Sequence, residues 1–103
     1  MPLFAFHGLD GPQSGPIRDR VRELHRQHLR EERSDCRAVA AGPLMQDDGE
    51  SMCGSLLVFE AQDRAAVERF MATDPYVVEG VFARVDIRRW NWTLGRSAGD
   101  AQL

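Results

Sequence analysis

The segment Gly54–Glu60 constrains the fold of this chain more than any other. Its centre, Leu56-Leu57-Val58-Phe59, is an uninterrupted apolar run, so a strand built from it has no face suited to water. Such a strand needs other elements around it to cover these side chains. We therefore expect residues 54–60 to form a central strand of a sheet.

The rest of the chain divides into a regular order of strands and helices. Further strands are expected at 2–7, 37–41 and 81–92, and helices at 16–33 and between Asp63 and Pro75. The resulting order β-α-β-β-α-β is typical of an α+β, ferredoxin-like fold, with an antiparallel sheet and both helices on one face. A chain of 103 residues has room for one domain, expected over 1–94 and followed by a flexible tail over 95–103.

Such a fold leaves the second face of its sheet bare. A homodimer that packs sheet face against sheet face would cover it. Trp90 and Trp92 break the alternation of the last strand, which indicates a bulge near Arg88 or Arg89, or a strand tip that leaves its own sheet. Because tryptophan is enriched at interfaces, the two rings indicate a subunit interface; the equal alternative is that they cover the edge of their own core.

Composition excludes several classes of function. The formal charge of −3 gives no reason to bind phosphate backbones, so we expect no nucleic-acid partner. No apolar run is long enough to span a bilayer, and the first residues lack the pattern of a secretion signal, which predicts a cytoplasmic protein without membrane contact. Cys36 and Cys53 have no zinc-site spacing and are interpreted as reduced thiols, with their roles left open.

The first expected helix carries an apolar stripe that ends in a histidine. Ile17, Val21, Leu24 and His28 recur at helical spacing, so the imidazole of His28 should point toward the core. The second helix has a similar stripe that ends at Asp74. Both helices should cover the same sheet face, so the two polar side chains can enter one layer.

A histidine held by a carboxylate suits general acid–base chemistry near neutral pH. The alternative is that His28 is a satisfied core histidine and Asp74 caps the turn at Pro75. The helices should run antiparallel, with His28 about 18 Å along the first one. Contact with Asp74 then requires a favourable stagger of the helices or a group from a second subunit.

Other polar residues are weaker candidates. His25 falls off the stripe and could lie at the rim of a cleft, and Ser55 could donate a hydrogen bond into that cleft. His7, His25 and His28 show no metal-ligand spacing, and no phosphate or dinucleotide fingerprint is present. We expect neither a metal nor an organic cofactor.

Several short motifs between about Asp10 and Trp92 together resemble the YCII-related (YciI-like) family. The motifs are His28-Leu29, Ala41-Gly42-Pro43-Leu44, Gly54-Ser55, Asp74-Pro75-Tyr76, Gly80-Val81-Phe82 and Arg88-Arg89-Trp90. The resemblance implies a dimeric α/β-barrel of ferredoxin-like subunits, and an active site built on a His and an Asp that match His28 and Asp74. It also implies relatedness to muconolactone isomerases and to dehydrochlorinases of chlorinated hydroxyquinols.

The sequence departs from this family pattern in its first helix. His25 stands where an arginine is common, so an anion-binding role of that arginine would pass to Arg18 or Arg22. Glu32 stands where a leucine is expected. These departures concern the substrate rather than the fold.

The combined interpretation is a small-molecule-binding protein that acts as a cofactor-independent lyase or isomerase on a small cyclic or aromatic substrate. His28 would move the proton, Asp74 would orient the imidazole of His28, and Ser55 or Tyr76 would donate a hydrogen bond. The alternative is a non-catalytic dimeric module that binds a ligand or joins an assembly.

Overall fold

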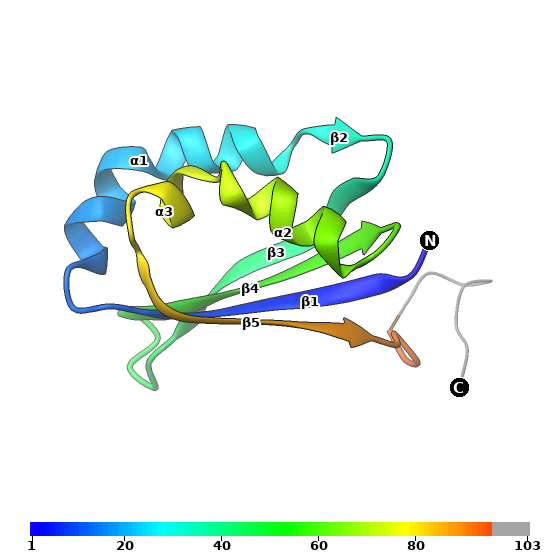
Figure 1. Cartoon of the computed structure of the whole chain (residues 1–103). Helices are drawn as coiled ribbons and strands as arrows, with labels where there is room; N and C mark the ends of the chain where they lie inside the picture. Colours follow the sequence, from blue (N-terminus) through cyan, green and yellow to red (C-terminus); the bar gives the residue numbers. More distant parts are fainter. Residues whose placement is uncertain (96–103) are drawn as a thin grey trace.

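The computed structural model describes residues 1–95, so the expected tail lies outside the described residues from residue 96 onward. Its elements, in chain order, are β1 (Leu3–Asp10), α1 (Ser14–Leu29), β2 (Glu32–Arg33), β3 (Cys36–Met45), β4 (Met52–Ala61), α2 (Arg64–Ala72), α3 (Pro75–Val78) and β5 (Phe82–Trp90). The helices lie together on one face of the sheet (Figure 1). No helix among the described residues is long and apolar enough to cross a membrane.

The sheet has five strands in the order β2-β3-β4-β1-β5, and every neighbouring pair is antiparallel. The middle strand is β4, which contains the apolar run 56–59, so its expected central position is confirmed. Strands β1 and β4 pair in the centre, and the two helical crossovers place β3 and β5 outside them. The expected α+β, ferredoxin-like architecture is confirmed.

Aromatic side chains fill the layer between sheet and helices. Phe6 on β1, Phe59 on β4 and Phe70 on α2 are at most 1% exposed, and the rings of Phe59 and Phe70 meet edge to face at 5.3 Å. The carboxylate of Asp63 accepts a hydrogen bond from the backbone N–H of Ala66, which starts α2 as expected. This core holds the helices against the sheet.

Helix α1 is shorter than expected, and it buries a different face than its apolar stripe predicts. It ends at Leu29, because Glu32–Arg33 pairs with the start of β3 as a short strand. Leu24 is 55% exposed, whereas Arg18 and His25 are 3% and 7% exposed. This face is buried because Arg18 and His25 both hydrogen-bond to buried partners. Apolar spacing alone would have buried Leu24 instead.

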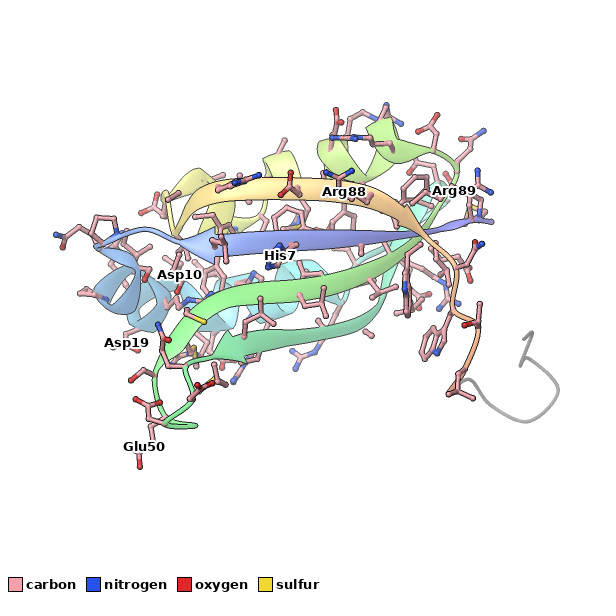
Figure 2. The ribbon with its side chains drawn as sticks, turned by 90° about the horizontal axis from the view of Figure 1, so that it is seen from below. His7, Asp10, Asp19, Glu50, Arg88 and Arg89 are labelled. Atoms are coloured by element: carbon pink, nitrogen blue, oxygen red, sulfur yellow. The ribbon has the colours of Figure 1, made fainter. Side chains whose placement is uncertain are left out.

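Strand β5 keeps its alternation to its end. Its register with β1 is regular through Trp90 and shifts between Leu9 and Asp10. The expected bulge near Arg88 or Arg89 is therefore wrong, and the irregularity lies at the opposite end of the strand. Figure 2 shows the sheet face that the helices leave uncovered, which carries His7 among other side chains.

Candidate active site

His25 on α1 and Asp74, which follows α2, form a buried pair. Nδ1 of His25 lies 2.7 Å from Oδ1 of Asp74, and the two side chains are 9% and 0% exposed. A carboxylate oxygen accepts, so Nδ1 carries the hydrogen, and in a neutral imidazole Nε2 is then the nitrogen with the lone pair. The described residues offer Nε2 no hydrogen bond, and the imidazole lies flat on the ring of Tyr76 at 3.7 Å.

Asp74 is fixed by the turn that joins α2 to α3. Its Oδ2 accepts hydrogen bonds from the backbone N–H groups of Tyr76 at 3.1 Å and Val77 at 3.4 Å, and Pro75 opens α3. The expected cap at Pro75 is confirmed. The same carboxylate uses its other oxygen to hold a histidine, so capping and histidine pairing occur together.

His28 does not pair with Asp74 within the chain, so the expected pair of these two residues is not confirmed. Nε2 of His28 lies 2.7 Å from the backbone oxygen of Phe70, and the two rings are 4.7 Å apart. The helices run antiparallel, so a residue earlier in α1 meets a residue later in the chain after α2. His28 therefore meets Phe70, and His25, about one turn earlier, meets Asp74.

A cavity of about 230 Å³ lies between α1 and the strands β3 and β4. Its wall includes all five residues that the sequence predicts to bind substrate, namely Arg18, Arg22, His25, Ser55 and Tyr76. Neither His28 nor Asp74 belongs to this wall. The tertiary structure thus gathers the expected polar residues at one place and puts His25 at the cavity in place of His28.

Arg18 organises one side of this cavity. Its Nε and Nη2 atoms bind the carboxylate of Asp10 at 2.9 and 2.8 Å, with both side chains buried. Nη2 also donates to the backbone oxygen of Gly54 at 2.9 Å and to Oγ of Ser55 at 3.0 Å. Ser55 accepts this bond, so its own hydroxyl hydrogen remains available to a ligand.

Sequence reasoning missed Asp10 and ranked His25 too low. Asp10 ends the buried strand β1, shortly before α1 begins. A carboxylate at that place could have been predicted to pair with a cation on the helix. For His25 the signal was its spacing of seven residues from Arg18, which places both on one helix face with Val21 and His28. A search for apolar periodicity overlooks this stripe, because three of its four members are polar.

Neither cysteine lines this cavity. Among the described residues, no three His, Cys, Asp or Glu side chains gather to hold a metal ion. Burial, together with the charge of nearby Asp35, raises the pKa of Cys36 to about 11. This thiol is therefore neutral at physiological pH and a poor nucleophile, while Cys53 is half-buried.

Comparisons with known proteins agree with this architecture. A comparison with curated proteins finds no match. The chain is similar to a solved structure of 5-chloro-2-hydroxyhydroquinone dehydrochlorinase (TftG) from Burkholderia phenoliruptrix AC1100, determined in complex with 2,5-dihydroxybenzoquinone. The two sequences are 28% identical and the TM-score is 0.73. The match covers 86% of this chain and 93% of TftG. The structure of PA3566 from Pseudomonas aeruginosa is 18% identical with a TM-score of 0.50, covers 94% of this chain and 95% of its own, and shows the fold alone. The sequence matches the YCII-related domain over residues 3–91, and the chain therefore belongs to the YCII-related family.

Proposed function

We propose that this protein is a cofactor-independent lyase or isomerase for a small cyclic or aromatic substrate, with His25 as its acid–base group. One observation carries the proposal: a ring nitrogen of His25 is held by Asp74, while the other lacks a protein partner among the described residues, and the ring borders the cavity. An imidazole held in this way can accept a proton from a substrate through its other nitrogen. The carboxylate of Asp74 fixes the tautomer and stabilises the imidazolium that forms.

The reaction begins when Nε2 of His25 takes a proton from a hydroxyl or a ring C–H group of the substrate. The electron pair left behind moves into the ring. In a lyase that removes a ring halide, the electron pair and a proton go to the ring carbon that bears the halogen. Loss of a second hydroxyl proton then expels the halide with its bonding pair, so one proton and the departing anion together account for the HX lost. In an isomerase, the imidazolium returns the proton to another ring atom and nothing is lost.

Two further wall residues suit a substrate with ring oxygens. The hydroxyl hydrogen of Ser55 is available because its oxygen already accepts from Arg18. The phenol of Tyr76 makes no hydrogen bond with the described residues and also borders the cavity. Donors of this kind stabilise the negative charge that develops on oxygen when a proton is removed.

Similarity to a dehydrochlorinase favours the lyase branch. TftG is named for action on 5-chloro-2-hydroxyhydroquinone and was determined with 2,5-dihydroxybenzoquinone. Loss of a proton and chloride from a chlorinated hydroxyquinol leaves a quinone, and no external oxidant is required because chlorine departs with the bonding pair. We extend this chemical class, rather than that particular substrate, to the present chain.

The test compares His25→Asn with the wild-type protein, using chloride release from 5-chloro-2-hydroxyhydroquinone as the readout. An asparagine amide can replace Nδ1 as donor to Asp74 but supplies no base at the Nε2 position. We expect turnover to fall by about 10²- to 10⁴-fold with little change in thermal stability. His28→Gln, which keeps a donor for the Phe70 carbonyl, is the matched control and should retain turnover.

Retained turnover in His25→Asn would exclude His25 as the acid–base group. A wild-type protein that binds 2,5-dihydroxybenzoquinone but releases no chloride from the chlorinated probe would favour the alternative of a non-catalytic ligand-binding module. Binding is measured by calorimetry on the same preparations.

We also propose that the protein is a homodimer in which a second copy covers the open sheet face. Leu9, Leu56 and Trp90 are 41%, 43% and 38% exposed, and their strand register directs them away from the helices. The ring of Trp92 lies 5.4 Å from that of Trp90 and extends this surface. Sedimentation equilibrium should give twice the chain mass, reduced to one chain by Leu56→Arg but not by Leu24→Arg on the helical side; a monomeric wild type would refute the dimer.

A further inference from the structure

We infer that the substrate carries a carboxylate, which Arg22 and Arg26 bind at the mouth of the cavity while the ring of the substrate lies beside His25. The inference rests on the proposed function and narrows its substrate class. It follows from the charge of the cavity wall, from the weak pairing of two arginines, and from the size of the cavity.

The wall is rich in cations and has no acidic member. Arg18, Arg22 and Arg26 line the cavity, and none of its described lining residues is Asp or Glu. Arg18 is already neutralised by the buried carboxylate of Asp10. The other two guanidinium groups therefore dominate the potential that a ligand meets on entry.

Arg22 and Arg26 have only exposed partners on their own helix. Arg22 contacts Asp19 at 3.1 Å and Arg26 contacts Glu23 at 3.0 Å, and these acidic side chains are 74% and 71% exposed. Exposed pairs at this helical spacing contribute little stability. A ligand carboxylate can therefore replace them at small cost, whereas displacing Asp10 from Arg18 would leave a buried charge unpaired.

The positions of Arg22 and Arg26 suit a substrate carboxylate at the mouth of the cavity and the substrate ring inside it. The two residues are one helical turn apart on α1, and Arg26 also borders an adjoining hollow along Ala38–Ala41 of β3. The deeper wall includes Leu57, which is 2% exposed. A volume of about 230 Å³ accommodates a substituted ring, since a cavity of about 150 Å³ accepts benzene.

The anion is a carboxylate rather than a phosphate because the donors come from side chains in mid-helix. Helix α1 begins at Ser14, so the backbone N–H groups near Arg22 and Arg26 are used within the helix. Phosphate sites commonly add backbone N–H groups at a helix N-terminus, which this mouth lacks. Two planar guanidinium forks match the two oxygens of a carboxylate.

The experiment measures binding without turnover. Calorimetry compares 2,5-dihydroxybenzoate with its neutral analogue 2,5-dihydroxybenzamide and with 2,5-dihydroxyphenyl phosphate. We expect the wild type to bind the carboxylate about tenfold or more tightly than the amide, and more tightly than the phosphate. The preference should weaken as ionic strength rises.

Variants then assign the preference to the two arginines. Arg22→Gln combined with Arg26→Gln should reduce the ratio of carboxylate to amide affinity to near one. Arg20→Gln is the matched control, because Arg20 lies on the same helix but pairs with Glu79 and does not border the cavity. Equal wild-type affinity for the two ligands, tighter binding of the phosphate, an unchanged ratio in the double variant, or no binding of the benzoate at millimolar concentration would each overturn the inference.

This outcome is separable from that of the proposed function. His25→Asn should keep the carboxylate preference even though it loses turnover, because His25 does not supply the charge. A protein that prefers the benzoate but performs no chemistry would retain the carboxylate site and lose the proposed reaction.

Discussion

The two buried histidines of α1 are almost equally hidden from solvent and occupy very different surroundings. His25 is 7% exposed and His28 is 8% exposed. His25 gives one nitrogen to Asp74 and borders a cavity, whereas His28 gives Nε2 to a backbone carbonyl and packs against the ring of Phe70. Burial and residue type are thus shared. The remaining ring nitrogen distinguishes the two, because Nδ1 of His28 lies 3.9 Å from a carboxylate oxygen of Glu31, whereas Nε2 of His25 has no hydrogen-bond partner among the described residues.

The same contrast extends along the helix. The part of α1 that precedes His25 adds polar contacts to the packing of Val21, since Arg18 binds Asp10 and lies over the ring of Tyr76 at 4.9 Å. The end of the helix at His28 is held by aromatic packing against α2. We therefore expect substitutions in the first half to disturb the site, and substitutions near His28 to disturb mainly the stability of the fold.

The largest stability effect is expected for Arg18→Met. Loss of the guanidinium leaves the Asp10 carboxylate buried without its partner, which should lower the free energy of unfolding by about 3–5 kcal/mol. Denaturant unfolding followed by circular dichroism measures this change. The double variant Arg18→Met with Asp10→Asn should recover part of the loss, because the unpaired charge is then absent.

Arg20→Met provides the comparison for this experiment. Arg20 also makes a short ion pair, 2.7 Å to Glu79, but its side chain is 58% exposed. Its loss should cost no more than about 1 kcal/mol. Equal effects of the Arg18 and Arg20 substitutions would contradict the view that buried polar contacts hold this half of the helix.

A smaller effect is expected for His28→Ala. The variant leaves the Phe70 carbonyl with only a long 3.4 Å bond from Thr73, so the free energy of unfolding should fall by about 1–3 kcal/mol. His28→Gln should lose less, because its amide can still donate. Both variants should keep their turnover at temperatures where they are folded.

Leu24→Gln is the neutral reference on the same helix. Its side chain is 55% exposed, so the substitution should change stability by no more than about 0.5 kcal/mol. If a folded His28→Gln protein lost turnover while Leu24→Gln kept it, the distinction between the two histidines would fail and His28 would regain a catalytic role.

The fold was largely readable because its signals are local. The apolar run of β4, the Asp63 cap and the stop at Pro75 each act within a few residues, and their order defines the architecture. The face of α1 was misread because Leu24 continues an apolar period that the helix does not use. Polar side chains with buried partners outweigh one exposed leucine, and those partners lie far away in the sequence.

The sequence by itself determined the order of the four long strands and of α1 and α2, the cap made by Asp74 and the polar residues that a cavity would gather. Only the tertiary structure decided which histidine meets Asp74. The physical reason is the antiparallel stagger of α1 and α2, since a displacement of about one helical turn exchanges His28 for His25. Helical periodicity places a residue on a face, whereas the packing of two helices sets how far along that face its partner lies.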